Sequence, residues 1–181
     1  QRTVLALSEI FVVSNVNSPI DSTVPAHASY MDMLSRNAFG NFRQLLDQVA
    51  THPSMGKYLS HFRNEREDPV TGRIPDENFA REVMQLFTIG LWQLNPDGTR
   101  RRDGSGNFIP TYNQDDVSGL AKVFTGWAWN GPDKSTARWN EWVALSAFPW
   151  REQMQNYPDF HSRSEKRFLG VTVPANTSGE E

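Results

Sequence analysis

Apolar side chains recur three or four positions apart through the first third of the chain, with polar residues between them. This spacing places the apolar residues on one side of a helix. It predicts four helices, at residues 4–13, 26–36, 41–51 and 54–62. The first is apolar on nearly every face, so we expect it to be buried. Pro53 ends the third helix, and Ser54 can cap the fourth.

The stretch from Pro75 to Gly90 has the clearest pattern of a helix with its own start and stop. Asp76 suits the N-cap, and Gly90 suits the left-handed position after the last turn. At about 100° per residue, one arc of this central helix is polar and the opposite arc is apolar. The polar arc consists of Asn78, Arg81, Glu82, Gln85 and Thr88, and the apolar arc of Phe79, Val83, Leu86, Phe87 and Gly90.

Beyond the central helix, turn sequences replace the helical spacing. Residues 91–112 contain an Asn-Pro-Asp-Gly turn and a second glycine-rich turn, which predict a small irregular β-hairpin. Another helix is expected to begin at Asn113 or Asp115 and to end at Gly126. No internal repeat is evident.

The last third of the chain is rich in Trp and poorly periodic, which predicts a long packed loop that ends in a short strand within residues 160–173. The fold class expected is therefore mainly α: an irregular multi-helix domain with a small β-hairpin and a long Trp-rich loop region. We expect a single domain over residues 1–181, with a helical part at 1–90, a hairpin at 91–112, a helix at 113–126 and a loop-rich part at 127–181.

The composition indicates a folded protein. The chain of 181 residues is 38% hydrophobic and contains six Trp and eleven Phe, which argues against disorder. The first predicted helix has no capping residue ahead of it, and residues 174–181 resemble a linker, so we expect a fragment of a longer helical domain. No signal peptide opens at Gln1, and no apolar run approaches the roughly 18–20 residues of a membrane span.

Charge and cysteine content exclude several classes of function. The net charge of −3 and the pI near 5.8 give no general attraction to nucleic acid. Arg100–Arg102 is the densest basic run, but Asp97 and Asp103 flank it, which favours a solvated turn. The absence of cysteine excludes disulfide scaffolds, cysteine nucleophiles and zinc-thiolate sites.

The start of the central helix holds the main candidates for chemistry, namely Glu77, Asn78, Arg81 and Glu82. Glu77 and Arg81 are four residues apart and can form an ion pair. One interpretation is a solvated helix face, and another is a buried polar network in which Arg81 donates to loop carbonyls. A functional interpretation makes Glu82 a general base or metal ligand and Arg81 an anion clamp. The two structural interpretations are favoured.

His161 is the best candidate among the histidines, because it lies in irregular sequence near Asp159, Glu165 and Lys166. With Glu82 it forms a candidate pair of metal ligands, although no His-Glu-x-x-His spacing exists. A loop histidine that caps or bridges is the favoured interpretation. The acids and amides between residues 95 and 107 lack the spacing of an EF-hand calcium loop. No cofactor can be assigned.

The sequence does not support nucleophile-elbow or phosphate-loop chemistry, because no Gly-x-Ser-x-Gly elbow and no glycine-rich loop after a strand is present. The tryptophans could form a sugar-stacking surface, although core packing is favoured. They are Trp92, Trp127, Trp129, Trp139, Trp142 and Trp150.

Several short motifs occur in an order that is found in a known family. They are Ala6–Ser14, Asn37–Arg43, His52–Leu59, Glu77–Glu82, Tyr112, Asp116-Val117, Thr125-Gly126-Trp127, His161, Lys166 and Leu169-Gly170. With these motifs the chain resembles the bacterial family called domain of unknown function 1800. The resemblance covers nearly the whole chain, and the pairing of Glu77–Glu82 with Thr125–Trp127 is its most specific part.

The resemblance implies a large, mostly helical and mostly exported bacterial protein, longer than this chain. A periplasmic or extracellular location is therefore expected. It implies no activity that can be transferred. Family members often carry His-Asp ahead of the lysine, whereas this chain has His161-Ser162, so a role for that acid is in doubt here.

Three functional hypotheses remain open. The first is an uncharacterised exported structural or interaction module, with a protein, a polysaccharide or the missing parts of its own chain as partner. The second is a metal-assisted hydrolase or oxidoreductase with a site formed by Glu82, Arg81 and His161, which requires Glu82 and His161 to share a cavity. The third is a carbohydrate-binding module, which requires at least two exposed, coplanar Trp rings.

Overall fold

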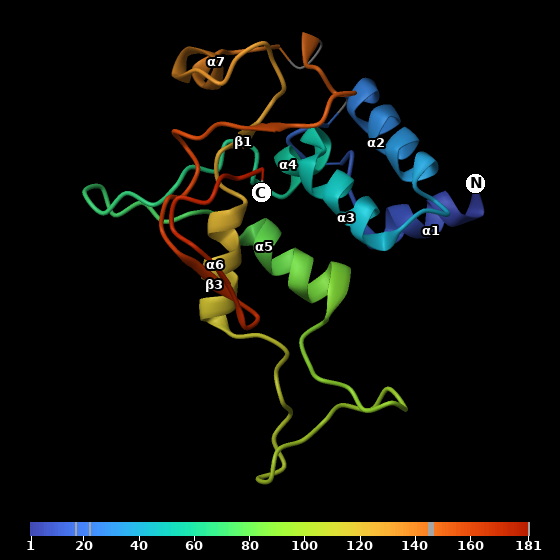
Figure 1. Cartoon of the computed structure of the whole chain (residues 1–181). Helices are drawn as coiled ribbons and strands as arrows, with labels where there is room; N and C mark the ends of the chain where they lie inside the picture. Colours follow the sequence, from blue (N-terminus) through green and yellow to red (C-terminus); the bar gives the residue numbers. More distant parts are fainter. Residues whose placement is uncertain (17, 22, 145–146, 181) are drawn as a thin grey trace.

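The computed structural model describes residues 1–16, 18–21, 23–144 and 147–180 (Figure 1). Helices account for 37% of these residues and strands for 10%, and much of the chain is loop. The predicted fold class is therefore confirmed in its coarser form. Helix exceeds strand, but long irregular segments hold the elements together.

Four helices precede the central one and pack together on one side of the molecule (Figure 1). They are α1 (Arg2–Ile10), α2 (Val24–Arg36), α3 (Phe42–Thr51) and α4 (Pro53–Tyr58). Tyr30 and Leu34 of α2 are buried, and Asn41 caps α3 by accepting the Arg43 N–H at 2.9 Å. The predicted cap of α4 is wrong, because His52 rather than Ser54 occupies that position.

The predicted burial of the first helix is also wrong. None of the residues of α1 is buried, and the side chains of Leu5 and Ile10 are 59% and 48% exposed. α1 contacts α2 and lies at the margin of the fold, so only one of its sides meets the core (Figure 1). Val4 and Leu7 face that side, and the fully buried residue is Phe11, just after the helix.

The central helix consists of two parts, α5 (Asn78–Glu82) and the π-helical turn η1 (Val83–Thr88). The predicted cap Asp76 lies one residue before the N-cap, and its carboxylate accepts the Asn78 N–H at 2.8 Å. The predicted stop is confirmed. Gly90 has a φ of +70°, and its N–H donates to the carbonyl of Met84 at 2.9 Å.

Residues 91–112, here called the arm, project from the helical body (Figure 1). The predicted single hairpin is in fact three short extended segments that pair with one another. Gln93 N–H donates to Ile109 O at 2.9 Å, Ile109 N–H to Arg101 O at 3.1 Å, and Arg101 N–H to Gln93 O at 2.8 Å. Each of the three segments therefore donates one backbone hydrogen bond to another, and the three bonds form a closed ring across the arm.

The two turns of the arm repeat the same hydrogen bonds eight residues apart. Asn95 N–H donates to Thr99 O at 2.8 Å, and Asp103 N–H donates to Asn107 O at 2.9 Å. A glycine with positive φ follows in each turn, Gly98 in the first and Gly106 in the second. The sequence pattern did not reveal this short repeat.

After the arm, α6 (Gln114–Val123) begins after the predicted Asn113, with a capping box in which Asn113 and Asp116 exchange side-chain and backbone hydrogen bonds. α6 packs against β3 (Lys166–Phe168), which pairs with β4 (Val171–Val173). The short strand expected near the C-terminal end is thus a hairpin. The other pair is β1 (Trp127–Ala128) with β2 (Gln155–Asn156), and α7 (Thr136–Asn140) lies between them in sequence.

The buried apolar side chains form three clusters. One lies among α1–α4 and the central helix, and one joins α5, η1 and α6. The third belongs to the Trp-rich loop region, where Trp139 stacks on Phe160 with ring centroids 4.1 Å apart. This loop region therefore has a core of its own, although it has little regular structure.

Candidate functional site

Glu77 and Arg81, at the start of the central helix, contact α6. The Glu77 carboxylate accepts hydrogen bonds from the Ser118 hydroxyl at 2.6 Å and from the Gln114 amide at 2.7 Å. Arg81 donates to Glu77 at 3.2 Å and to Gln114 at 3.3 Å. Burial alone would raise the pKa of Glu77, but the hydrogen bonds from Ser118 and Gln114 and the charge of Arg81 hold it below its usual value.

The predicted ion pair of Glu77 and Arg81 is therefore present, but the partners of Arg81 are side chains rather than loop carbonyls. Asn78 is exposed, and its amide reaches the Ser60 hydroxyl at 3.4 Å. Glu82 lies at the junction with η1, and its Oε2 atom is buried without a hydrogen-bond partner in the described part of the chain. The polar residues at the start of the central helix therefore mainly join this helix to α6.

Replacing Arg81 with Ala should lower the free energy of unfolding by less than about 1 kcal/mol, because exposed ion pairs contribute little. The Arg81 side chain is 40% exposed, and Gln114 and Ser118 still satisfy Glu77 after its loss. Urea denaturation of the variant beside the wild type measures the difference. A loss above about 2 kcal/mol would show that Arg81 is a buried hub instead.

His161 lies in a second polar cluster, together with the Thr125-Gly126-Trp127 motif. Its Nδ1–H donates to the Thr125 carbonyl at 2.8 Å, and the Asn156 amide donates to the same oxygen at 3.1 Å. The ring is buried, and this burial lowers the pKa of His161, so the ring is neutral at pH 7. A Cβ on Gly126 would lie 2.8 Å from the backbone nitrogen of His161, which explains the need for glycine there.

Glu67 belongs to the same cluster, although no motif in the sequence singled it out. Ser162 donates its N–H to the Thr125 hydroxyl at 2.8 Å and its O–H to Glu67 Oε1 at 2.9 Å. Burial raises the pKa of Glu67, but hydrogen bonds from Ser164 and Ser162 outweigh this effect and hold the pKa below its usual value. Its Oε2 atom is buried, with no hydrogen-bond partner in the described segments.

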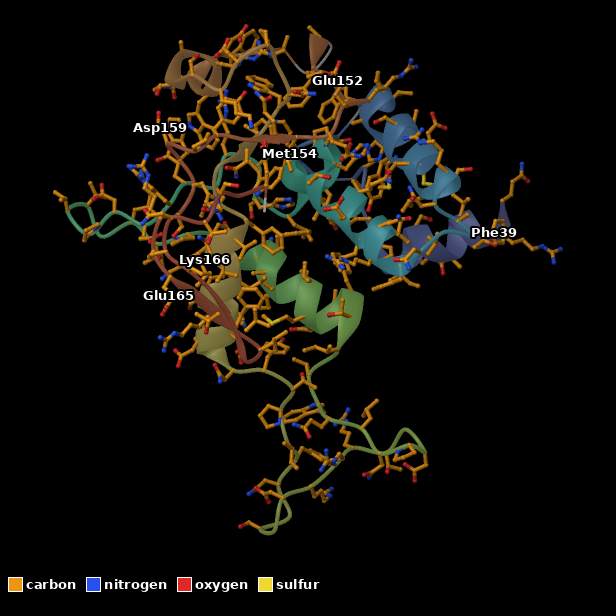
Figure 2. The ribbon with its side chains drawn as sticks, in the orientation of Figure 1. Phe39, Glu152, Met154, Asp159, Glu165 and Lys166 are labelled. Atoms are coloured by element: carbon orange, nitrogen blue, oxygen red, sulfur yellow. The ribbon has the colours of Figure 1, made fainter. Side chains whose placement is uncertain are left out.

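Lys166 begins β3 beside α6 (Figure 2) and is only 1% exposed. Its ammonium donates to the Ser164 carbonyl at 3.5 Å, a long hydrogen bond. Burial lowers the pKa of Lys166, and the nearby charge of Glu67 opposes this shift. The cluster of Glu67, Thr125, His161, Ser162 and Lys166 thus connects segments that are distant in sequence.

The structure places the two candidate metal ligands in different surroundings. His161 lines a cavity of about 150 Å³ with Asn156, Arg163 and residues 176–179, and Glu82 does not line it. No hydrogen bond or ion pair links Glu82 to His161 within the described ranges. Among the same residues, no group of three or more His, Asp or Glu side chains is placed to hold a metal ion. The metal site stays a prediction without geometric support.

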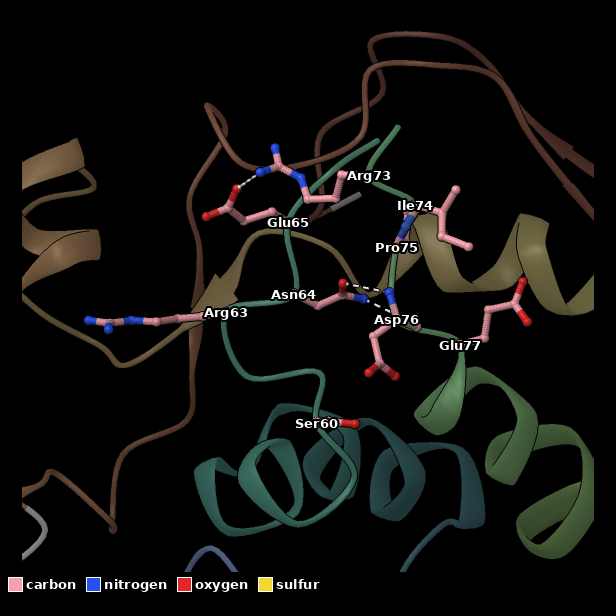
Figure 3. A pocket seen from close by; sticks show the side chains of 9 residues that line it. All are labelled: Ser60, Arg63, Asn64, Glu65, Arg73, Ile74, Pro75, Asp76 and Glu77. Carbon is pink, nitrogen blue, oxygen red and sulfur yellow. Dashed lines mark hydrogen bonds and ion pairs between the residues drawn. The ribbon is translucent and has the colours of Figure 1, made fainter. Parts of the chain in front are cut away.

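A wider cavity of about 690 Å³ lies beside the start of the central helix (Figure 3). Arg73 and Glu65 form an ion pair of 2.5 Å at its rim, and Asn64 and Asp76 exchange two hydrogen bonds of 3.0 and 2.8 Å. The Arg63 side chain extends away from the Asp76 side of this cavity. Of the charged side chains at the rim, Arg73 and Glu65 therefore pair with each other, and the Asp76 carboxylate accepts the Asn78 N–H at 2.8 Å.

The tryptophans mostly serve the core. Trp129, Trp139 and Trp150 are buried, and Trp92 and Trp127 are half-buried. Only one of the six is largely exposed, Trp142 at 82%. The structure therefore shows no pair of exposed Trp rings of the kind that the third hypothesis requires.

Comparison with known proteins gives one match. The sequence model of a family described as protein of unknown function, DUF1800, matches residues 1–181. No curated protein and no solved structure matches the chain. Within the described residues, no helix has both the length and the apolar character needed to cross a membrane.

Proposed function

The chain belongs to the DUF1800 family, and we propose that it is an interaction module of an exported bacterial protein that binds an acidic polysaccharide through its arm. The observation that carries this proposal is a set of exposed arginines on the arm without acidic partners. In the body, by contrast, Glu77 joins the central helix to α6, and Glu67 contacts the distant Ser162. Export is proposed because the family that the chain resembles consists mostly of exported proteins.

The arm has more positive than negative charge available to a partner. Arg100, Arg101 and Arg102 are exposed, and none of them forms an ion pair with a residue in the described ranges. The two acids of the arm are engaged inside its turns. Asp97 accepts hydrogen bonds from Thr99, and Asp103 accepts them from Ser105 and Asn107. These hydrogen bonds hold the two carboxylates within the turns, and with three arginines and two acids the arm keeps a net charge of +1.

Aromatic rings orient two of these arginines. The guanidinium carbon of Arg102 lies 4.1 Å from the centre of the Phe108 ring, and that of Arg100 lies 5.3 Å from it. Trp92 packs against the same ring, with centroids 5.6 Å apart. Arg102 donates one N–H to the Gly106 carbonyl at 2.5 Å, and its other donors and those of Arg100 are available to carboxylates, while aromatic faces suit sugar rings. This pairing of arginine with aromatic rings supports a carboxylated sugar polymer as the partner.

We expect the protein to bind polygalacturonate but not neutral dextran, with an affinity that falls as salt is added. The double variant Arg100→Gln/Arg102→Gln should bind at least about tenfold more weakly, because two charge-assisted contacts are lost. Isothermal titration calorimetry measures both affinities. The matched control is Arg151→Gln, which removes an exposed arginine outside the arm and should leave binding unchanged.

Two outcomes overturn the proposal. Equal affinity of the wild type and the double variant would remove the arm as the recognition element. Equal affinity for polygalacturonate and polyglutamate would show that the arm recognises charge alone, as an acidic protein partner requires. Fractionation of cells that express the full-length protein tests export separately.

A further inference from the structure

The small cavity beside His161 is lined by residues from two segments, 156–163 and 176–179. Its volume of about 150 Å³ far exceeds the roughly 10–15 Å³ that one ordered water molecule needs. The C-terminal segment is fixed in its place in the wall. Asn176 donates its N–H to the Arg163 carbonyl at 3.0 Å, and a Cβ on Gly179 would lie 2.3 Å from the Asn156 amide nitrogen. The cavity is therefore a defined part of the fold with room for a small organic molecule.

Two buried side chains in the wall each have a hydrogen-bond acceptor without a donor. Asn156 and His161 are only 2% and 4% exposed, so the little surface that they expose faces the cavity that they line. His161 donates its Nδ1–H to the Thr125 carbonyl at 2.8 Å, which leaves the lone pair of the neutral ring on Nε2. The Asn156 amide nitrogen donates to the same carbonyl at 3.1 Å, which leaves its Oδ1 atom as an acceptor. No described residue donates a hydrogen bond to either atom, and a buried acceptor without a donor is unfavourable.

The charges around the cavity select a neutral ligand. Arg163 is the charged side chain among the described lining residues, and one of its N–H groups already donates to Asp159 at 3.1 Å. A cationic ligand would meet no carboxylate among these lining residues. An anion such as a carboxylate could accept from Arg163, but it has no proton to donate to His161 Nε2 or Asn156 Oδ1. A hydroxyl group suits both kinds of partner, because it donates one hydrogen bond and accepts others.

We propose that this cavity binds a small neutral polyol, of the size of glycerol, through hydroxyl groups that donate to His161 Nε2 and Asn156 Oδ1. The two side chains are adjacent, with Asn156 Nδ2 3.4 Å from His161 Nδ1, so hydroxyls on neighbouring carbons can reach both acceptors. A further hydroxyl can accept from Arg163 or exchange a hydrogen bond with Ser178, which also lines the cavity. The volume limits the ligand to a few carbons. This site is separate from the arm, and the inference does not depend on polysaccharide binding.

The test is an NMR titration of the ¹⁵N-labelled wild-type protein with glycerol. We expect saturable binding with a Kd of about 1–10 mM, as befits a ligand with so few atoms. Propan-1-ol, which lacks adjacent hydroxyls, and acetate, which lacks a proton to donate, should each bind at least about tenfold more weakly. The Nε2 resonance of His161 should shift as this atom gains a hydrogen bond, whereas the ring resonances of His52, which caps α4, should not move.

A variant that fills the cavity avoids any change to the buried side chains. Ser178→Leu places a larger apolar side chain in the wall from an exposed position, and it should weaken glycerol binding at least about tenfold. The matched control is Thr172→Leu, which adds the same side chain at an exposed position of β4 outside the cavity and should leave the Kd unchanged.

Three results would each overturn the proposal. The absence of saturable binding would show that the cavity holds water only. Equal affinity for glycerol and propan-1-ol would show that adjacent hydroxyls are not recognised. Equal glycerol affinity of the wild type and the Ser178→Leu variant would place the binding elsewhere on the molecule.

Discussion

Acidification from pH 7 to pH 4.5 should lower the free energy of unfolding by about 5 kcal/mol, mainly through His52 and His61. Both have a pKa of about 4 in the folded protein, against 6.5 for an ordinary histidine. Between these values the unfolded chain binds more protons than the folded one. The stabilisation is therefore complete above pH 6.5 and is lost as the pH falls toward 4.

His52 depends on its neutral form because it caps α4. Its Nδ1 atom accepts the backbone N–H of Ser54 at 3.2 Å, and a protonated ring has no lone pair there to accept it. Burial is the largest cause of the lowered pKa, and the charge of Arg36 adds to it, while a backbone hydrogen bond with Ser29 opposes both. Protonation of His52 at low pH therefore breaks the hydrogen bond by which it caps α4.

His61 is buried between aromatic rings. It stacks on Phe79 with ring centroids 3.8 Å apart, and its Nε2–H donates to the Ala50 carbonyl at 2.8 Å. Its Nδ1 atom has no partner in the described residues, so a second proton would be buried without an acceptor. This burial lowers the pKa of His61, and the Ala50 carbonyl opposes the shift only in part.

Urea denaturation at several pH values measures this loss, and two variants assign it. His52→Asn keeps a capping side chain, and His61→Gln keeps a donor, but neither can titrate in this range. Each should reduce the loss between pH 7 and pH 4.5 to about half. Glu67 and Glu77 contribute below this window, because their pKa values are held under the usual 4.5. An unfolding free energy that is constant over the window would contradict the assignment.

Gly119→Ala should lower the free energy of unfolding by about 3 kcal/mol or more, even though Ala is the better helix former. A Cβ at position 119 would lie 1.8 Å from the carbonyl oxygen of Arg167 and 2.7 Å from its carbonyl carbon. Both atoms belong to the backbone of β3, so no side-chain rotation relieves the contact. α6 and β3 would have to separate, and the cores on either side would open.

Gly104→Ala is the matched control, because no atom lies within 4 Å of the Cβ that it would add. Thermal and urea denaturation of both variants, monitored by tryptophan fluorescence, measure the difference in their free energies of unfolding. If Gly119→Ala falls within about 1 kcal/mol of the wild type while folding normally, the close approach of α6 and β3 is not essential.

The helices α2 and α6 could be predicted from sequence because their determinants are local. The capping box of Asn113 and Asp116 and the apolar spacing of α2 lie within one or two turns of the chain. Burial of α1 could not be predicted in this way. Whether an apolar helix is covered depends on neighbours elsewhere in the fold, and α1 has them on one side only.

The sequence identified the residues at the start of the central helix but not their partners. Gln114 and Ser118 are 37 and 41 residues away from Glu77. Their spacing of four on a predicted helix was the one available indication of a matching polar face. Glu67 gave no such indication, because it lies in a charged loop and its partner Ser162 is 95 residues away.

The π-helical turn η1 sets the direction in which the arm leaves the body. A π turn contains about one residue more than an α turn of the same rise, and one residue in an α-helix corresponds to about 100° of rotation. Rewinding η1 as regular α-helix at its present length would therefore turn the arm by roughly 100° about the helix axis, and the face with Arg100 and Arg102 would point to a different side. Deleting one residue between Val83 and Thr88 would instead remove the π turn and leave the arm in its present direction. The loss of one residue at this place should thus be tolerated, whereas a change of winding without a change of length would redirect the arm.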